Sequence, residues 1–134
     1  MKRAATALRI LIGVAGAIQL ALGAMLWSGN ADAIVPVHVT VGLILVLSLW
    51  ALAIMALVGG VARGLAAVTV IWGLVTPALG LAQTSLVPGD SHWVIQVIHL
   101  LVGLTAIALG QILAARLIRA AGAGTWRGKS GAMA

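Results

Sequence analysis

Four long apolar segments joined by short connections constrain this chain more than any other feature of its sequence. Each segment has close to the roughly 20 residues that a helix needs to cross a bilayer. The chain of 134 residues is 63% hydrophobic and only 7% charged, which excludes an ordinary water-soluble domain. We therefore predict one integral-membrane domain, residues 1–134, embedded in a lipid bilayer. The predicted spans are residues 7–27, 34–58, 65–83 and 93–118.

The connections between the spans are rich in glycine, proline and small polar residues, which favour turns and helix caps. Because these connections are short, helices that are consecutive in the sequence must run antiparallel. The predicted fold class is therefore all-α, a four-helix transmembrane bundle with up-down-up-down connectivity.

Charged residues separate to the two ends of this bundle, with all 8 basic residues at one end and both acidic residues at the other. Because basic residues are concentrated on the cytoplasmic side of membrane proteins, we predict that the N and C termini are cytoplasmic. The expected location is a bacterial inner membrane. The basic residues are Lys2, Arg3, Arg9, Arg63, Arg116, Arg119, Arg127 and Lys129, and the acidic residues are Asp32 and Asp90.

The net charge of +6 reflects this orientation and does not indicate a nucleic-acid partner. The basic C-terminal tail, residues 119–134, is expected to contact anionic lipid headgroups. The N-terminus also has features of a secretory signal, but its apolar stretch is longer than the usual core of such a signal. We therefore expect this segment to remain as the first helix.

Two histidines inside the spans provide the best sequence clue to function. His38 and His99 each lie a short way into a span, and each is followed four residues later by a glycine, Gly42 or Gly103. Ionisable side chains within a bilayer are costly and usually functional. Because both spans begin at the outer face, the two imidazoles are expected at similar depth, facing each other from diagonal helices of the bundle.

Two opposed imidazoles at one level are the arrangement that a b-type haem uses for its axial ligands. We therefore predict His38 and His99 as metal ligands through neutral ring nitrogens. A residue four positions along a helix lies on the same face, so Gly42 and Gly103 are predicted to leave room for the flat macrocycle. The chain has no cysteine, which excludes covalent haem attachment and thiolate metal sites.

Three further polar residues in the same half are candidates for contact with such a cofactor. Thr40 and Gln96 are predicted to orient a ligand imidazole or to touch the cofactor, since a metal-bound histidine normally donates its second ring nitrogen to an acceptor. His92, at the membrane interface, is the third candidate, and a solvated or capping role is its alternative. Neither arginine nor lysine lies at this end, so haem propionates would meet water or loop residues.

Other roles for the histidines remain open. Histidines can form hydrogen bonds between membrane helices, and glycine at this spacing also permits close helix packing. The chain would then be a structural or pigment-binding accessory subunit of a larger membrane complex, without haem. A small transporter is disfavoured because the spans contain no carboxylate. A zinc or copper site is disfavoured because it needs three or more convergent ligands.

The surroundings of the two histidines are similar. When His38 is placed on His99, Pro-Val-His-Val-Thr-Val-Gly falls on Val-Ile-His-Leu-Leu-Val-Gly, and the first two spans fall on the last two. This pattern is compatible with a duplicated helical hairpin.

With its predicted bundle and its histidine pair, the chain resembles the small four-helix membrane b-type cytochromes. The resemblance implies bis-histidine haem b and electron exchange with a quinol or quinone, or with a redox protein. Larger members of that group carry a second histidine pair near the opposite face, which this chain lacks. The implied role is therefore local electron transfer near the outer face.

The sequence shows no catalytic dyad and no nucleophile, so no catalytic residue is predicted. An electron-transfer or cofactor-binding protein is favoured over an independent enzyme. Both a homo-oligomer and a place in a larger membrane complex stay open.

Overall fold

A computed structural model describes residues 1–29 and 32–131 of the chain, which form helices joined by short connections. These residues form four α-helices and one short 3-10 helix, and they contain no strand. The predicted all-α, four-helix architecture is therefore confirmed. The elements are α1 (Lys2–Trp27), the 3-10 helix η1 (Asp32–Ile34), α2 (Val35–Val58), α3 (Arg63–Ala82) and α4 (His92–Gly131).

The helices differ most from the predicted spans at the N-terminus of α1 and the C-terminus of α4. Helix α1 begins at Lys2, five residues before the predicted span of residues 7–27. Helix α4 continues to Gly131, through most of the segment expected as a basic tail, residues 119–134. Lysine, arginine and alanine make up most of the α1 extension and favour helix, whereas the α4 extension is helical although it contains four glycines.

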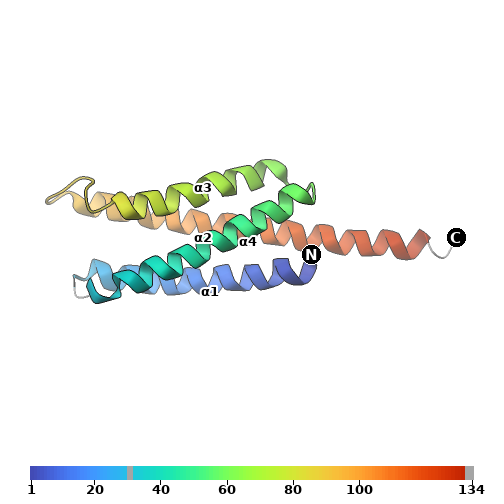
Figure 1. Ribbon diagram of the computed structural model, residues 1–134, viewed down its shortest axis with the longest axis horizontal. Coiled ribbons are helices and arrows are strands. Elements are labelled where there is room, and N and C mark those ends of the chain that lie inside the picture. The colour runs from blue at the N-terminus through green and yellow to red at the C-terminus, as the bar shows by residue number, and fades with distance from the viewer. Residues whose placement is uncertain (30–31, 132–134) are drawn as a thin grey trace.

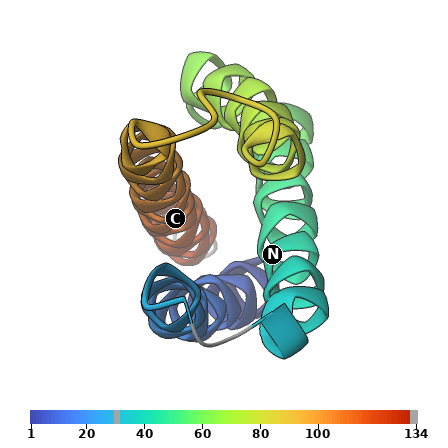
Figure 2. The same ribbon diagram turned by 90° about the vertical axis from the view of Figure 1, so that its left-hand side faces the viewer.

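The four helices run alternately in opposite directions, which gives the up-down-up-down order (Figure 1). Seen from the end, they surround a common axis in chain order, with α1 opposite α3 and α2 opposite α4 (Figure 2). Helices α2 and α4 contact each other across the bundle, whereas no contact joins α1 and α3 within the described residues. The diagonal pair α2 and α4 is therefore the closer of the two.

The packed core lies in the half of the bundle that holds the basic residues. The largest fully buried side chains belong to this half and come from all four helices. In the other half, formed by residues 17–44 and 74–105, Ile95 is the only residue that is buried among those whose burial is described. The fully buried side chains are Ile12, Leu49, Leu52, Thr69 and Leu113.

Polar side chains tie neighbouring helices together in the packed half and near the middle. The indole of Trp50 on α2 donates to the carbonyl of Val70 on α3, at 3.3 Å. The indole of Trp72 on α3 donates to the carbonyl of Val102 on α4, at 2.9 Å.

Helices α1 and α4 are joined by a reciprocal pair of hydrogen bonds. Nε of Arg9 donates to Oε1 of Gln111, and Nε2 of Gln111 donates to the carbonyl of Arg9, both at 3.0 Å. These two bonds satisfy a polar pair well inside the apolar helices. Such bonds are typical of contacts between membrane helices.

All four helices are long and apolar enough to cross a membrane. A helix pairs most of its backbone groups within itself, as the interior of a bilayer requires, although Pro77 inside α3 cannot donate a backbone hydrogen bond. Large apolar side chains remain exposed on their outward faces, including Val58, Ile71 and Leu81. A lipid environment accommodates these faces, which would be unfavourable in water.

The core predicts which leucines of α2 stabilise the bundle. We expect Leu49→Ala to lower the free energy of unfolding by about 2–5 kcal/mol, because Leu49 is fully buried and its truncation leaves a cavity. Leu47→Ala is the matched control, since the Leu47 side chain is 60% exposed. Unfolding in mixed detergent micelles measures both. Equal losses in the two variants would contradict this assignment of the core.

Candidate functional site

The structure brings the side chains of the two predicted ligand residues, His38 and His99, close to each other. Their ring centroids lie 6.3 Å apart, and the ring planes are tilted by 50°. His38 lies in the first turn of α2 and His99 in the second turn of α4, so both belong to the end with the acidic residues. The diagonal helices α2 and α4 therefore meet at this end through two imidazoles.

Three buried polar atoms at this level have no hydrogen-bond partner. They are Nδ1 of His38, Nδ1 of His99 and Oε1 of Gln19 on α1. Leaving a buried polar group unsatisfied costs about 1–3 kcal/mol, so native proteins rarely concentrate such groups without a functional reason. The two imidazoles and the Gln19 amide therefore define the candidate site.

Glycines of α1 and α3 lie against the two imidazole rings. A Cβ atom placed at Gly80 would be 3.0 Å from Cε1 of His99, which is a tight contact. A Cβ atom at Gly23 would be 3.8 Å from Cε1 of His38, an ordinary van der Waals contact. The ring of each histidine thus lies against a glycine of the helix that precedes it in the chain. His38 lies against Gly23 of α1, and His99 lies against Gly80 of α3.

The glycines of the two His-x-x-x-Gly segments have different neighbours. At Gly42, a Cβ atom would lie 2.7 Å from Nε2 of Gln19, so the Gln19 side chain covers this glycine. At Gly103, no atom lies within 4 Å of the Cβ position. The Cβ position is therefore open at Gly103, whereas Gln19 occupies it at Gly42.

The glycine positions repeat between the two hairpins. Gly16 and Gly23 on α1 are seven residues apart, as are Gly73 and Gly80 on α3. Gly16 meets Ile107 of α4, and Gly73 meets the indole of Trp50 on α2. The two hairpins thus make contacts of the same kind, as a duplicated hairpin would.

The other predicted cofactor contacts are placed differently. The Thr40 hydroxyl donates to the carbonyl of Pro36 in its own helix, at 2.8 Å, and the residue is exposed. Nδ1 of His92 lies 3.3 Å from the carbonyl of Leu86 in the connection before α4. Gln96 is half-buried, about one turn before His99. Thr40 and His92 therefore make local bonds, and neither joins the histidine pair by a hydrogen bond.

The site offers a metal ion two histidines and few other protein ligands. Among the described residues, no group of three or more His, Cys, Asp or Glu side chains is placed to hold a metal ion. A zinc or copper site needs more ligands from the protein than this pair supplies.

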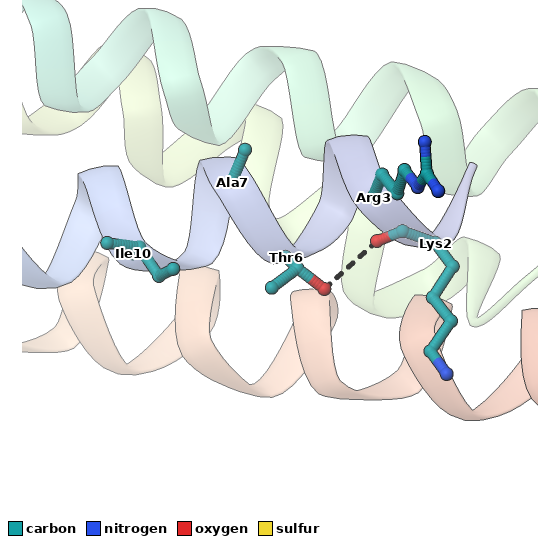
Figure 3. A pocket seen from close by; sticks show the side chains of 5 residues that line it. All are labelled: Lys2, Arg3, Thr6, Ala7 and Ile10. Carbon is teal, nitrogen blue, oxygen red and sulfur yellow. Dashed lines mark hydrogen bonds between the residues drawn. The ribbon is translucent and has the colours of Figure 1, made fainter.

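An open surface hollow lies at the opposite, basic end of the bundle (Figure 3). Its lining comes from α1 alone, and Thr6 within it donates a hydrogen bond to the carbonyl of Lys2, at 3.0 Å. This hollow lies at the opposite end of the bundle from His38 and His99, and neither histidine lines it. The lining residues are Lys2, Arg3, Thr6, Ala7 and Ile10.

Comparisons of the chain with protein-family models, with curated proteins and with solved structures found no match. The function must therefore be argued from the site itself.

Sequence reasoning recognised the two histidines but not their immediate neighbours. Gln19, Gly23 and Gly80 all lie outside the His-x-x-x-Gly segments, so that motif does not point to them. The near repeat of the two hairpins is the sequence feature that points to the glycines. Gly23 and Gly80 each lie near the end of the first helix of a hairpin, and the histidine lies on the second helix. The spacing from this glycine to the histidine is 15 residues in the first hairpin and 19 in the second, so aligning both pairs needs a gap of four residues.

The unequal glycine contacts predict an unequal response to added methyl groups. We expect Gly80→Ala to displace the His99 ring, because its Cβ would be 3.0 Å from Cε1, and Gly23→Ala to leave His38 in place. Histidine Cε1–H cross-peaks in NMR spectra of the protein in detergent measure both. A shifted His38 signal with an unmoved His99 signal would contradict these contacts.

Proposed function

We propose that the protein binds one b-type haem through His38 and His99 and takes part in local electron transfer. The observation that supports this most is the pair of imidazoles, 6.3 Å apart, on opposite helices of an apolar bundle. For two imidazoles on one metal, bonds of about 2 Å and a further ~1 Å from each nitrogen to its ring centroid give about 6 Å between centroids. The observed separation agrees with this value.

The small number of protein ligands favours a porphyrin over a bare ion. A metal held by His38 and His99 would need its other donors from elsewhere, and a porphyrin would supply four nitrogen donors. The absence of a larger ligand group among the described residues supports this choice.

The packing of the histidine half also supports a large apolar ligand. Ile95 is the only buried residue of this half among those whose burial is described, so side chains pack less closely here than in the other half. Gly23 and Gly80 leave room for the imidazole rings themselves, and the Cβ position of Gly103 is open. A flat apolar ligand would supply the contacts that side chains supply in the packed half.

The unpaired nitrogens disfavour a purely structural role for the histidines. Histidines that join membrane helices do so by hydrogen bonds. Here Nδ1 of His38 and Nδ1 of His99 are buried and have no partner. An accessory subunit without a cofactor would gain nothing from burying them.

The chain's own residues would hold, orient and insulate the cofactor. Bound haem supplies reversible one-electron chemistry at its iron. The two imidazoles fix its position near one end of the bundle, and the surrounding apolar helices lower the local dielectric. A site near one face suits exchange with a quinol or a redox protein at that face.

The central test is the visible spectrum of the purified full chain with haem. We expect sharp reduced b-type bands, and we expect both His38→Ala and His99→Ala to abolish the six-coordinate spectrum. Thr105→Val is the control, because the Thr105 hydroxyl is exposed and bonds to the Leu101 carbonyl of its own helix. A colourless wild-type protein, or bands unchanged in both histidine variants, would refute the proposal.

We further propose that the histidine end faces outward and the basic end faces the cytoplasm of a bacterial inner membrane, by the positive-inside rule. The chain has no cysteine, so single substitutions give clean labelling sites. We expect a membrane-impermeant maleimide added to whole cells to label Ser91→Cys but not Gly64→Cys, both of which are exposed positions. The reverse pattern would invert the orientation.

A further inference from the structure

Gln19 places an unused hydrogen-bond acceptor beside one of the two histidines. Its Oε1 is buried in the apolar bundle without a partner. Burying a polar group without a partner costs free energy. The side chains of Trp50, Trp72 and Gln111, elsewhere in the bundle, have no buried polar atom without a partner.

The contacts between α1 and α2 show how near Gln19 lies to His38. The Gln19 side chain covers Gly42, and the His38 ring rests on Gly23. Gln19 and Gly23 are one turn apart on α1, and His38 and Gly42 are one turn apart on α2. Because the two helices are antiparallel, Gln19 and His38 occupy adjacent places on the same helix interface.

The two groups are chemically complementary. A histidine that binds a metal through one ring nitrogen keeps a proton on the other and normally donates it to an acceptor. Nδ1 of His38 is enclosed and has no acceptor, while Oε1 of Gln19 is enclosed and has no donor. No hydrogen bond joins them in this structure, and the flexible Gln19 side chain can reorient to form one.

We propose that Gln19 is a positioning residue for His38: when Nε2 of His38 binds the haem iron, Nδ1–H donates to Oε1 of Gln19. The inference rests on the proposed haem site. The bond would fix the ring orientation and increase electron donation from this imidazole to the iron. The oxidised, more positive iron would thereby be stabilised, and the reduction potential lowered.

The second hairpin lacks this arrangement, so the two ligands are not equivalent. Thr76 stands four residues before Gly80, as Gln19 stands four residues before Gly23. Its hydroxyl donates to the Trp72 carbonyl within α3, at 2.8 Å, and no side chain covers Gly103. Thr76 is therefore the matched control position for Gln19.

The test compares Gln19→Leu, Gln19→Glu and Thr76→Val in the haem-loaded full chain. Haem affinity and midpoint potential are measured, with helix content as a check on folding. We expect Gln19→Leu to weaken haem binding about 10–100-fold, as loss of a partner to a metal ligand typically does, and to raise the potential. Gln19→Glu keeps an acceptor oxygen, so its affinity should stay close to wild type and its potential at or below it. Thr76→Val should match wild type in both.

The outcomes separate this inference from the haem proposal. Haem that binds with its potential and affinity unaffected by Gln19→Leu would overturn the role of Gln19 while leaving the site intact. An equal effect of Thr76→Val would also overturn it. If Gln19→Leu fails to fold, a raised potential in Gln19→Glu overturns the inference and an unchanged or lowered one supports it. A wild-type chain that binds no haem would overturn both proposals.

Discussion

Close contact of small residues in the packed half determines the arrangement of the whole bundle. In lipid, apolar side chains gain little by leaving the solvent, so helices associate mainly through tight van der Waals packing. At Gly110 of α4, a Cβ atom would lie 2.7 Å from Leu49 of α2 and 2.9 Å from Ile12 of α1. Three helices therefore meet where a side chain is missing. This contact sets α2 and α4 on opposite sides of the axis and so directs their histidines toward each other.

The two halves of the bundle treat polar groups differently. In the packed half, Ser48 and Thr69 are buried, and each donates to a carbonyl of its own helix. In the other half, the two imidazoles and the Gln19 amide are half-buried, and each has one buried atom without a partner. The packed half stabilises the fold, and this stability offsets the free-energy cost of the unpartnered polar atoms in the histidine half.

The near repeat of the hairpins has a consequence for the site. Two similar hairpins supply two similar imidazoles, each resting on a glycine of the preceding helix. Their surroundings nevertheless differ, because Gln19 covers Gly42 while Gly103 is open. The repeat thus gives a similar pair of imidazoles in unequal surroundings. In the proposed haem site, Gln19 would stand beside one of them only.

The sequence alone determined the number of helices, their alternating order and the common level of His38 and His99. These properties depend on segment length, overall apolarity and short connections, all of which are local. The division of charge between the ends is equally plain in the sequence, although the membrane orientation inferred from it remains a prediction.

Only the tertiary structure decided which side chains surround the histidines. It placed Gln19, Gly23 and Gly80 at the site, and it directed Thr40 into a bond within its own helix. The rotation of each helix about its axis decides these neighbours. In a soluble bundle an apolar stripe reveals that rotation, but here the lipid-facing and inward faces are both apolar, so helical periodicity carries little information about it. The rotation follows instead from the fit of glycines against particular side chains on other helices, which depends on contacts between residues far apart in the chain.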